Sequence, residues 1–156
     1  MSWNDAVIEQ FLRGEQRIAN TFDRDFLILL DTIGAKSGLR RTSPVGCFAD
    51  GDRLLIVASK AGADTHPAWY ANLVAHPTVG VRRWENDELA EYQATAVVLD
   101  GAERDRVFEW IVQQAPGFGT YQTRTDRVIP VVALHPRRQT TPPRAGPLSP
   151  TPGDPS

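Results

Sequence analysis

Glycines and cations are concentrated in one short stretch, 34–42 (GAKSGLRRT). Its polar side chains are Lys36, Ser37, Arg40, Arg41 and Thr42. Glycines let backbone N–H groups approach an anion, and cations and hydroxyls add charge and hydrogen-bond donors. The stretch therefore predicts a cradle for a phosphate or another anion, although an ordinary basic turn between two strands has the same composition. Its spacing does not match a nucleotide P-loop.

A second loop of small and polar residues follows the apolar run 53–59 (RLLIVAS). The residues around this strand end are Ala58, Ser59, Lys60, Gly62 and Ala63. A strand that ends in such a loop can present backbone groups to a flat heterocycle, with Ser59 and Lys60 as donors toward its carbonyl groups. Many strands end in similar loops, so this pattern alone is a weak signal.

Aromatic and amide side chains come next, in the segment 66–73 (HPAWYANL). Trp69 and Leu73 are typical core residues, whereas Asn72 is a candidate for a hydrogen bond to a ligand. His66 is interpreted as a surface or capping histidine. Farther along, Tyr121 opens a polar segment and could donate a proton to a substrate or orient it, while local Asp–Arg pairing is the simpler role for the rest of that segment.

Several classes of chemistry are excluded by what accompanies these residues. The histidines His66, His76 and His135 are scattered without ligand spacing, and Cys47 is the single cysteine, so we expect neither a metal site nor an internal disulfide. No nucleophile lies beside a base and no carboxylates are paired, which argues against hydrolysis. If the protein is an enzyme, we expect a cofactor to supply the reactivity.

Bulk properties indicate a soluble cytoplasmic protein. The net charge of −2 argues against a nucleic-acid binder. The first twenty residues mix charges with apolar positions, unlike a signal peptide, and no run approaches the roughly twenty apolar residues of a membrane-spanning helix. The 156 residues fit one domain, expected over 1–138. The segment 139–156, rich in Pro, Ser, Thr and Gly, is predicted to be a disordered tail.

The elements that must position these groups are predicted from periodicity and turn residues. An amphipathic helix is expected over 1–22, with its start capped by Ser2 and Asp5. Its apolar stripe favours packing on the core, with a mobile lid or a weak membrane-surface contact as alternatives. Strands are expected over 26–33, 45–49, 53–59, 78–84, 89–99 and 128–134, with short helices after Pro67 and from Asp100 to Pro116.

These elements predict an α+β fold, because no βαβ alternation is present. About six mostly antiparallel strands with helices inserted between hairpins fit a small, partly open barrel. Turns are expected at 50–52 and 86–87. Pro130 cannot donate a ladder hydrogen bond, so the last strand is expected at an edge or a bulge.

The order of the motifs resembles the deazaflavin-dependent nitroreductase family, also described as F-420-dependent quinone reductases. The likeness extends over about 26–134 and is most specific in the block ASKAGADTHPAWYANLVAHP. The resemblance implies a split β-barrel that holds reduced coenzyme F-420 and passes hydride to a quinone, or to a nitro or enone acceptor. FMN in the same kind of barrel, or a carrier of F-420 without catalysis, are the alternatives.

The resemblance also implies roles for individual residues. The coenzyme's phosphate and oligoglutamate tail would bind Lys36, Ser37, Arg40, Arg41 and Thr42. The wall and ring contacts would come from Pro44, Ala58, Ser59, Lys60, Gly62, Ala63, Pro67, Trp69, Asn72 and Leu73. Tyr121 would face the acceptor, and the proton that completes the reaction would come from solvent, Ser59 or Tyr121.

Overall fold

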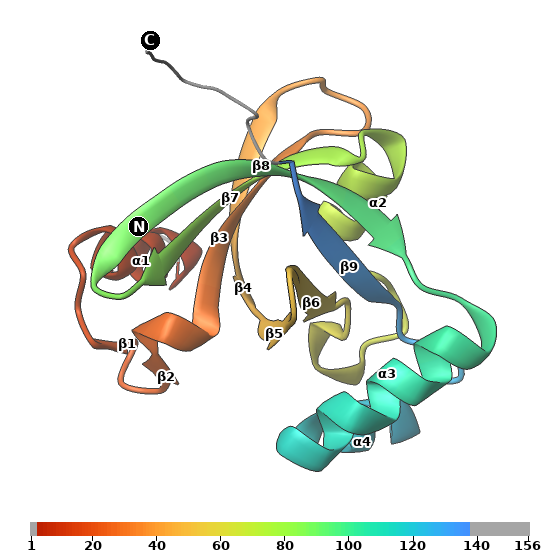
Figure 1. The fold of residues 1–156 in the computed structure, drawn as a ribbon. Coiled ribbons are helices and arrows are strands. Elements are labelled where there is room, and N and C mark those ends of the chain that lie inside the picture. The colour runs from red at the N-terminus through yellow and green to blue at the C-terminus, as the bar shows by residue number, and fades with distance from the viewer. Residues whose placement is uncertain (1–2, 138–156) are drawn as a thin grey trace, which may run out of the picture.

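Seven antiparallel strands form one curled sheet in the computed structural model, which describes residues 3–137 (Figure 1). In spatial order they are β4 (Arg40–Gly46), β3 (Leu27–Ile33), β7 (Thr78–Glu85), β8 (Glu88–Val98), β9 (Val131–Pro136), β6 (Arg53–Val57) and β5 (Phe48–Asp50). Side chains alternate between the two faces of each strand. The concave face therefore carries one continuous apolar cluster, to which every strand of the sheet except β5 contributes a buried residue.

A bend at Cys47 turns this sheet into a partly closed barrel. β4 and β5 lie at opposite ends of the strand order, yet only Cys47 separates them in the chain. The Cys47 N–H donates to the Phe26 carbonyl at 2.9 Å, which fixes the bend. Cys47 is a packed core residue, and its burial raises the pKa of the thiol to about 11.

Helices cover the barrel on two sides. The helix α1 (Trp3–Leu12) packs Val7 and Phe11 against the outward residues Leu27 and Leu29 of β3. The helices α3 (Gly101–Gln114) and α4 (Gly117–Thr123) cover the outer face of β6 and β9 (Figure 1). The helix α2 (Ala68–Ala75) adds Leu73 to the concave cluster and contacts β3 and β8. No helix within residues 3–137 is long and apolar enough to cross a membrane.

The fold class expected from the sequence is confirmed, with more strands than the six expected. Both predicted hairpins form: Gly51 and Asp52 connect β5 to β6, while Asn86 and Asp87 connect β7 to β8. Asn86 and Asp87 adopt φ values of 52° and 63°, the left-handed pair that a tight two-residue hairpin turn requires. The helix expected from Asp100 is α3, although the Asp100 side chain makes no capping hydrogen bond.

The expectation of one helix over 1–22 was wrong, because α1 ends at Leu12. Gly14 follows with a φ of 76°, a left-handed conformation that stops the helix. The chain then forms a two-stranded hairpin from β1 (Arg17–Ile18) and β2 (Phe22–Asp23), followed by the turn η1 (Arg24–Phe26). Ile18 is fully buried through this hairpin rather than through a helical stripe. Ser2 of the expected cap and the expected tail 139–156 lie outside the described residues.

The last strand is also placed differently from the expectation of an edge or a bulge. β9 lies inside the sheet, paired with β8 on one side and β6 on the other. Pro130 precedes its first paired residue, and the Pro130 carbonyl accepts a hydrogen bond from the Ala58 N–H at 2.9 Å. The proline therefore removes no donor from the ladder. The additional helix α4 occupies part of what the sequence indicated as a polar loop.

Candidate functional site

A cavity of about 270 Å³ lies between β4 and the segment that follows β6. Six of the residues predicted for the site line it: Pro44, Ser59, Lys60, Pro67, Trp69 and Tyr121. They come from β4, from the segment after β6, from the start of α2 and from α4. The fold thus brings together three of the four motifs that the sequence separates.

Two hydroxyl groups are available in this cavity. Ser59 is 8% exposed, and within residues 3–137 neither its side chain nor the Tyr121 hydroxyl has a hydrogen-bond partner. The Tyr121 ring is held edge-on against Phe118, with centroids 5.7 Å apart. Both hydroxyls can therefore donate to a molecule bound in the cavity, and Tyr121 has a fixed ring from which to do so.

Six aromatic side chains in contact with one another form an aromatic wall beside the cavity; Tyr121 is the one predicted for the site, and all of them except Phe48 line the cavity. Ring contacts of 5.6 to 6.5 Å between centroids connect, in order, Trp3, Phe22, Phe26, Phe48, Phe118 and Tyr121. Phe26 lies directly on Gly46, where a Cβ atom would stand 2.5 Å from the ring. These residues are far apart in the sequence, and apart from Tyr121 no motif indicated that they meet at the cavity.

The segment after β6 has an unusual backbone. Lys60, Ala61 and Gly62, the turn η2 (Lys60–Gly62), have φ values of 45°, 54° and 82°. A non-glycine residue in this left-handed region is strained and persists only where its surroundings hold it. Three predicted residues of this segment, Ala58, Gly62 and Ala63, do not line the cavity and serve instead as its support.

Arg127, which the sequence did not single out, contacts this segment at four acceptors. Its guanidinium donates to the carbonyls of Ala58 at 3.1 Å, Ser59 at 2.8 Å and Ala63 at 2.7 Å. It also lies 2.9 Å from Nδ1 of His66. The sequence favoured local Asp–Arg pairing for this loop, but Arg127 instead binds backbone carbonyls of a distant segment. An arginine in a polar loop carries no sequence signal for such a distant contact.

The glycine-rich basic turn lies at the opposite end of β4. The Gly34 N–H donates to Leu39 O at 2.8 Å, and the Ser37 hydroxyl accepts from the Leu39 N–H at 3.1 Å. Asn72 on α2 accepts from the Ala35 N–H at 2.9 Å and donates to the Thr32 hydroxyl at 3.1 Å. Asn72 therefore positions the turn, and Leu73, 1% exposed, packs in the barrel core.

The adjacent cations of this region have different surroundings. Lys36 and Arg41 are exposed and make no ion pair or side-chain hydrogen bond with any residue that the structure describes. Arg40 instead donates to Asp31 at 2.7 Å. Thr42 and Arg82 bind the other oxygen of the same buried carboxylate, at 2.5 Å and 3.1 Å.

The Asp31 carboxylate is charged despite its burial. Burial opposes its ionisation, but hydrogen bonds from Arg40 and Thr42 and the charge of Arg82 outweigh that effect and lower the pKa of Asp31. Part of the cationic charge predicted for an anion is thus already neutralised within the protein. The charges free to meet a ligand are those of Lys36 and Arg41.

The cavity and the basic turn together make an elongated site. The seven residues of β4, at about 3.3 Å per residue, separate them by roughly 20 Å. In the sheet β4 pairs only with β3, so its other edge makes no strand pairing along this distance. The arrangement suits a molecule with a flat head at the cavity and a long anionic tail at the turn.

Comparison with known proteins agrees with this geometry. A family model described as F420H(2)-dependent quinone reductase matches residues 5–136. The chain belongs to this family. Its cofactor is therefore coenzyme F-420, and its activity is that of an F-420-dependent reductase.

Individual relatives of this F-420-dependent reductase support the same assignment. It is 38% identical over 110 residues to the F420H(2)-dependent quinone reductase Rv1261c of Mycobacterium tuberculosis, which covers 69% of this chain and 71% of that protein. A solved F420-H2 dependent reductase is 38% identical, with a TM-score of 0.61, over 70% of this chain and 94% of the other. A third relative, solved as a domain-swapped dimer, is also 38% identical, with a TM-score of 0.62, over 84% of this chain and 98% of the other.

The F-420-dependent reductase has side chains suited to this coenzyme. Lys36 and Arg41 have no competing acid within the described part of the chain, as a polyanionic tail requires. The cavity combines apolar ring surfaces with two free hydroxyls, as a flat heterocycle requires. FMN, the alternative cofactor, gains no support from the family.

Proposed function

We propose that this reductase binds F-420 with its ring in the cavity beside Ser59 and Tyr121 and its tail along β4 toward Lys36 and Arg41, and that it reduces quinones. The observation that carries this proposal is the elongated arrangement, in which a cavity with aromatic walls is joined by an unpaired strand edge to two free cations. A nucleotide with a single phosphate, such as FMN, would leave the cations of the turn unused.

Each group of residues then has a distinct task. When bound, the reduced coenzyme supplies a hydride, that is, a proton with an electron pair. Lys36 and Arg41 neutralise the tail and fix the position of the ring at the other end of the site. The aromatic wall from Trp3 to Tyr121 excludes water and offers an apolar surface to the acceptor's ring. Ser59 or Tyr121, or solvent, provides the proton that completes the reduction.

Titration separates this proposal from its alternatives. Binding would be followed by fluorescence with F-420, with a deazaflavin fragment that lacks phosphate and tail, and with FMN. We expect F-420 to bind most tightly, because only F-420 reaches both ends of the site. Equal affinity for the intact coenzyme and the fragment would contradict the tail position. Tighter binding of FMN than of F-420 would contradict the proposal that this site holds F-420.

Rapid mixing of the reduced complex with menadione tests catalysis. A reductase should accelerate oxidation of the bound coenzyme, whereas a carrier would leave the rate unchanged. Because a deazaflavin gives up electrons in pairs, we expect the hydroquinone without one-electron products, and detection of quinone radicals would count against hydride transfer. A nitroaromatic and an enone in parallel reactions would define the acceptor class.

Weak contact with a membrane surface and a cytoplasmic location stay predictions.

A further inference from the structure

We infer that Arg127 is a positioning residue for coenzyme binding, because its guanidinium holds the segment 58–63, with the left-handed turn 60–62 inside it, in the shape that lines the cavity. This inference rests on the proposed function, in which that segment contacts the deazaflavin. Arg127 does not itself line the cavity, so it acts through the backbone it holds. Nothing in the sequence pattern assigned it a role in the site.

The guanidinium contacts both ends of the strained turn. Its bonds to the carbonyls of Ala58 and Ser59 hold the residues before the left-handed turn, and its bond to Ala63 holds the residue after it. A planar fork with five N–H donors can satisfy several acceptors in fixed directions, whereas a lysine ammonium is a single point. The geometry thus matches what only an arginine can supply.

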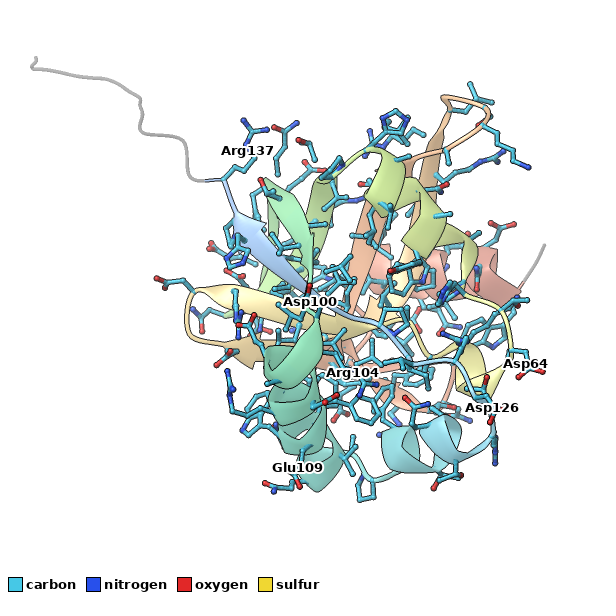
Figure 2. The ribbon with its side chains drawn as sticks, turned by 90° about the vertical axis from the view of Figure 1, so that its right-hand side faces the viewer. Asp64, Asp100, Arg104, Glu109, Asp126 and Arg137 are labelled. Carbon is cyan, nitrogen blue, oxygen red and sulfur yellow. The ribbon has the colours of Figure 1, made fainter. Side chains whose placement is uncertain are left out.

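Arg127 is itself anchored to the core of the protein. Gln122 donates to the Arg127 carbonyl at 2.8 Å and accepts from the Ile129 N–H at 3.0 Å. Arg104 on α3 is 9% exposed and donates to Gln122 at 2.8 Å and to Ile129 O at 2.8 Å. Figure 2 shows Arg104 on α3 beside this segment. A continuous set of hydrogen bonds therefore connects a buried arginine of the core to the wall of the cavity.

A second contact keeps the two loops together. The Thr125 hydroxyl donates to Asp64 at 2.8 Å, and Figure 2 shows Asp64 and Asp126 at the same end of the molecule. A Cβ atom on Gly62 would stand 2.7 Å from the Tyr121 carbonyl, so the segment fits closely against α4. Besides its own backbone hydrogen bonds, from Gly62 N–H to Ser59 O and from Ala63 N–H to Lys60 O, the segment is therefore held by the residues after Tyr121.

The contacts of Arg127 with the segment 58–66, called the clamp below, include His66, which makes them sensitive to pH. Arginine can only donate, so Nδ1 of His66 accepts and the ring is neutral when the contact exists. The ring also contacts that of Tyr70, with centroids 4.6 Å apart, and the other ionisable side chains of its loop are Asp64, which Thr125 binds, and Lys60, which donates to Thr65 at 3.2 Å. Burial first and the charge of Arg127 second lower the pKa of His66. The contact therefore persists at neutral pH and is lost as the pH falls through that lowered pKa.

The central test is Arg127→Met in the full chain. We expect faster amide hydrogen exchange in the segment 58–66 of the ligand-free protein, and F-420 affinity about tenfold or more weaker, because charged hydrogen bonds are lost. At saturating coenzyme, the rate of menadione reduction should fall less than the affinity does. Unchanged exchange in 58–66, or unchanged affinity in the presence of faster exchange, would overturn the inference.

Two variants keep this test decisive. Arg106→Met removes an exposed arginine of α3 that has no partner within residues 3–137, and should leave both exchange and affinity unchanged. If Arg127→Met does not fold, Arg127→Lys retains the charge and should give an intermediate loss, whereas wild-type affinity in Arg127→Lys would contradict the need for a fork. Failure of the wild-type protein to bind F-420 would count against the proposed function, while the exchange comparison would still test Arg127.

The pH profile supplies a readout that a merely structural arginine would not change. F-420 affinity of the wild-type protein should weaken as the pH falls below about 6.5, the ordinary pKa of histidine, because His66 is protonated at the lower pKa that it has in the folded protein. His66→Gln offers Arg127 an acceptor that does not titrate, so it should bind F-420 as the wild type does at pH 8 and lose less affinity at pH 5. Identical profiles for wild type and His66→Gln would exclude the His66 contact from the clamp.

Discussion

The basic turn at 34–39 and the segment 58–66 both border the proposed coenzyme site, yet they are held in different ways. The turn is closed mainly by its own atoms, through the bonds of Gly34, Ser37 and Gly38 to neighbours in the same loop. The segment 58–66 has two internal backbone bonds, Gly62 N–H to Ser59 O and Ala63 N–H to Lys60 O, but it is also held from outside by Arg127 and Thr125, more than sixty positions away.

This difference matches what each loop presents to the coenzyme in the proposed complex. The turn offers charged side chains to a tail, and because a local backbone supports it, Lys36 and Arg41 need no partners within the protein. In the proposed complex the other segment offers its backbone and Ser59 to the ring, where small displacements change the contact. A shape held by neighbours that are themselves anchored, as Arg127 is through Gln122, is better defined than one that a short loop adopts alone.

The largest contrast should come from one methyl group placed in each loop. Gly62→Ala puts a Cβ atom 2.7 Å from the Tyr121 carbonyl at a φ of 82°, and we expect a loss of about 3 kcal/mol in the free energy of unfolding. Gly38→Ala, at a φ of 71° with nothing within 4 Å of the added atom, should cost about 1 kcal/mol. Urea unfolding measures both, and equal losses would mean that the two loops are held alike.

The basic turn is also supported by another element, through the Asn72 side chain of α2, and a substitution can remove this support. Asn72→Ala loses the bonds to Ala35 and Thr32, and we expect a loss of about 2 kcal/mol in stability. Affinity for F-420 should fall while affinity for the tail-free fragment changes little, because only the turn is released. Gln113→Ala, an exposed amide on α3, serves as the control. An equal loss of affinity for the fragment would show that Asn72 acts on the ring instead.

The same contrast explains how much the sequence could predict. The basic turn and the two-residue hairpins were predictable, because glycines, cations and Asn–Asp pairs act over a few neighbouring residues. The split barrel followed from the order of the strands and from the family resemblance. Arg127 and the aromatic wall could not be predicted, since their contacts cross the whole chain and depend on where α4 and the N-terminal hairpin pack. The helix over 1–22 was overextended because buried Ile18 and partly buried Phe22 fit its spacing without belonging to it.

Neighbouring arginines on β4 test which charges belong to the coenzyme. Arg41→Ala removes a free cation, and we expect F-420 binding to weaken by about 1 kcal/mol, roughly fivefold, with unchanged stability. Arg40→Ala removes a partner of Asp31, so its larger effect should be on stability. Fluorescence titration measures the F-420 affinity of the two variants, and urea unfolding measures their stability. Equal losses of affinity in both variants would mean that Arg40 also binds the coenzyme's tail.

The smallest effect expected is the acid dependence that Asp31 contributes. Its pKa in the folded protein lies below that of the unfolded chain, about 3.9, so its contribution to stability is complete above that value and is lost as the pH falls through the folded pKa. Asp31→Asn should therefore be less stable than the wild type at pH 7, and the two stabilities should converge toward pH 3. Urea unfolding across this range measures the difference. A constant gap would mean that Arg40 is not held by the Asp31 charge and remains available, like Arg41, to the coenzyme's tail.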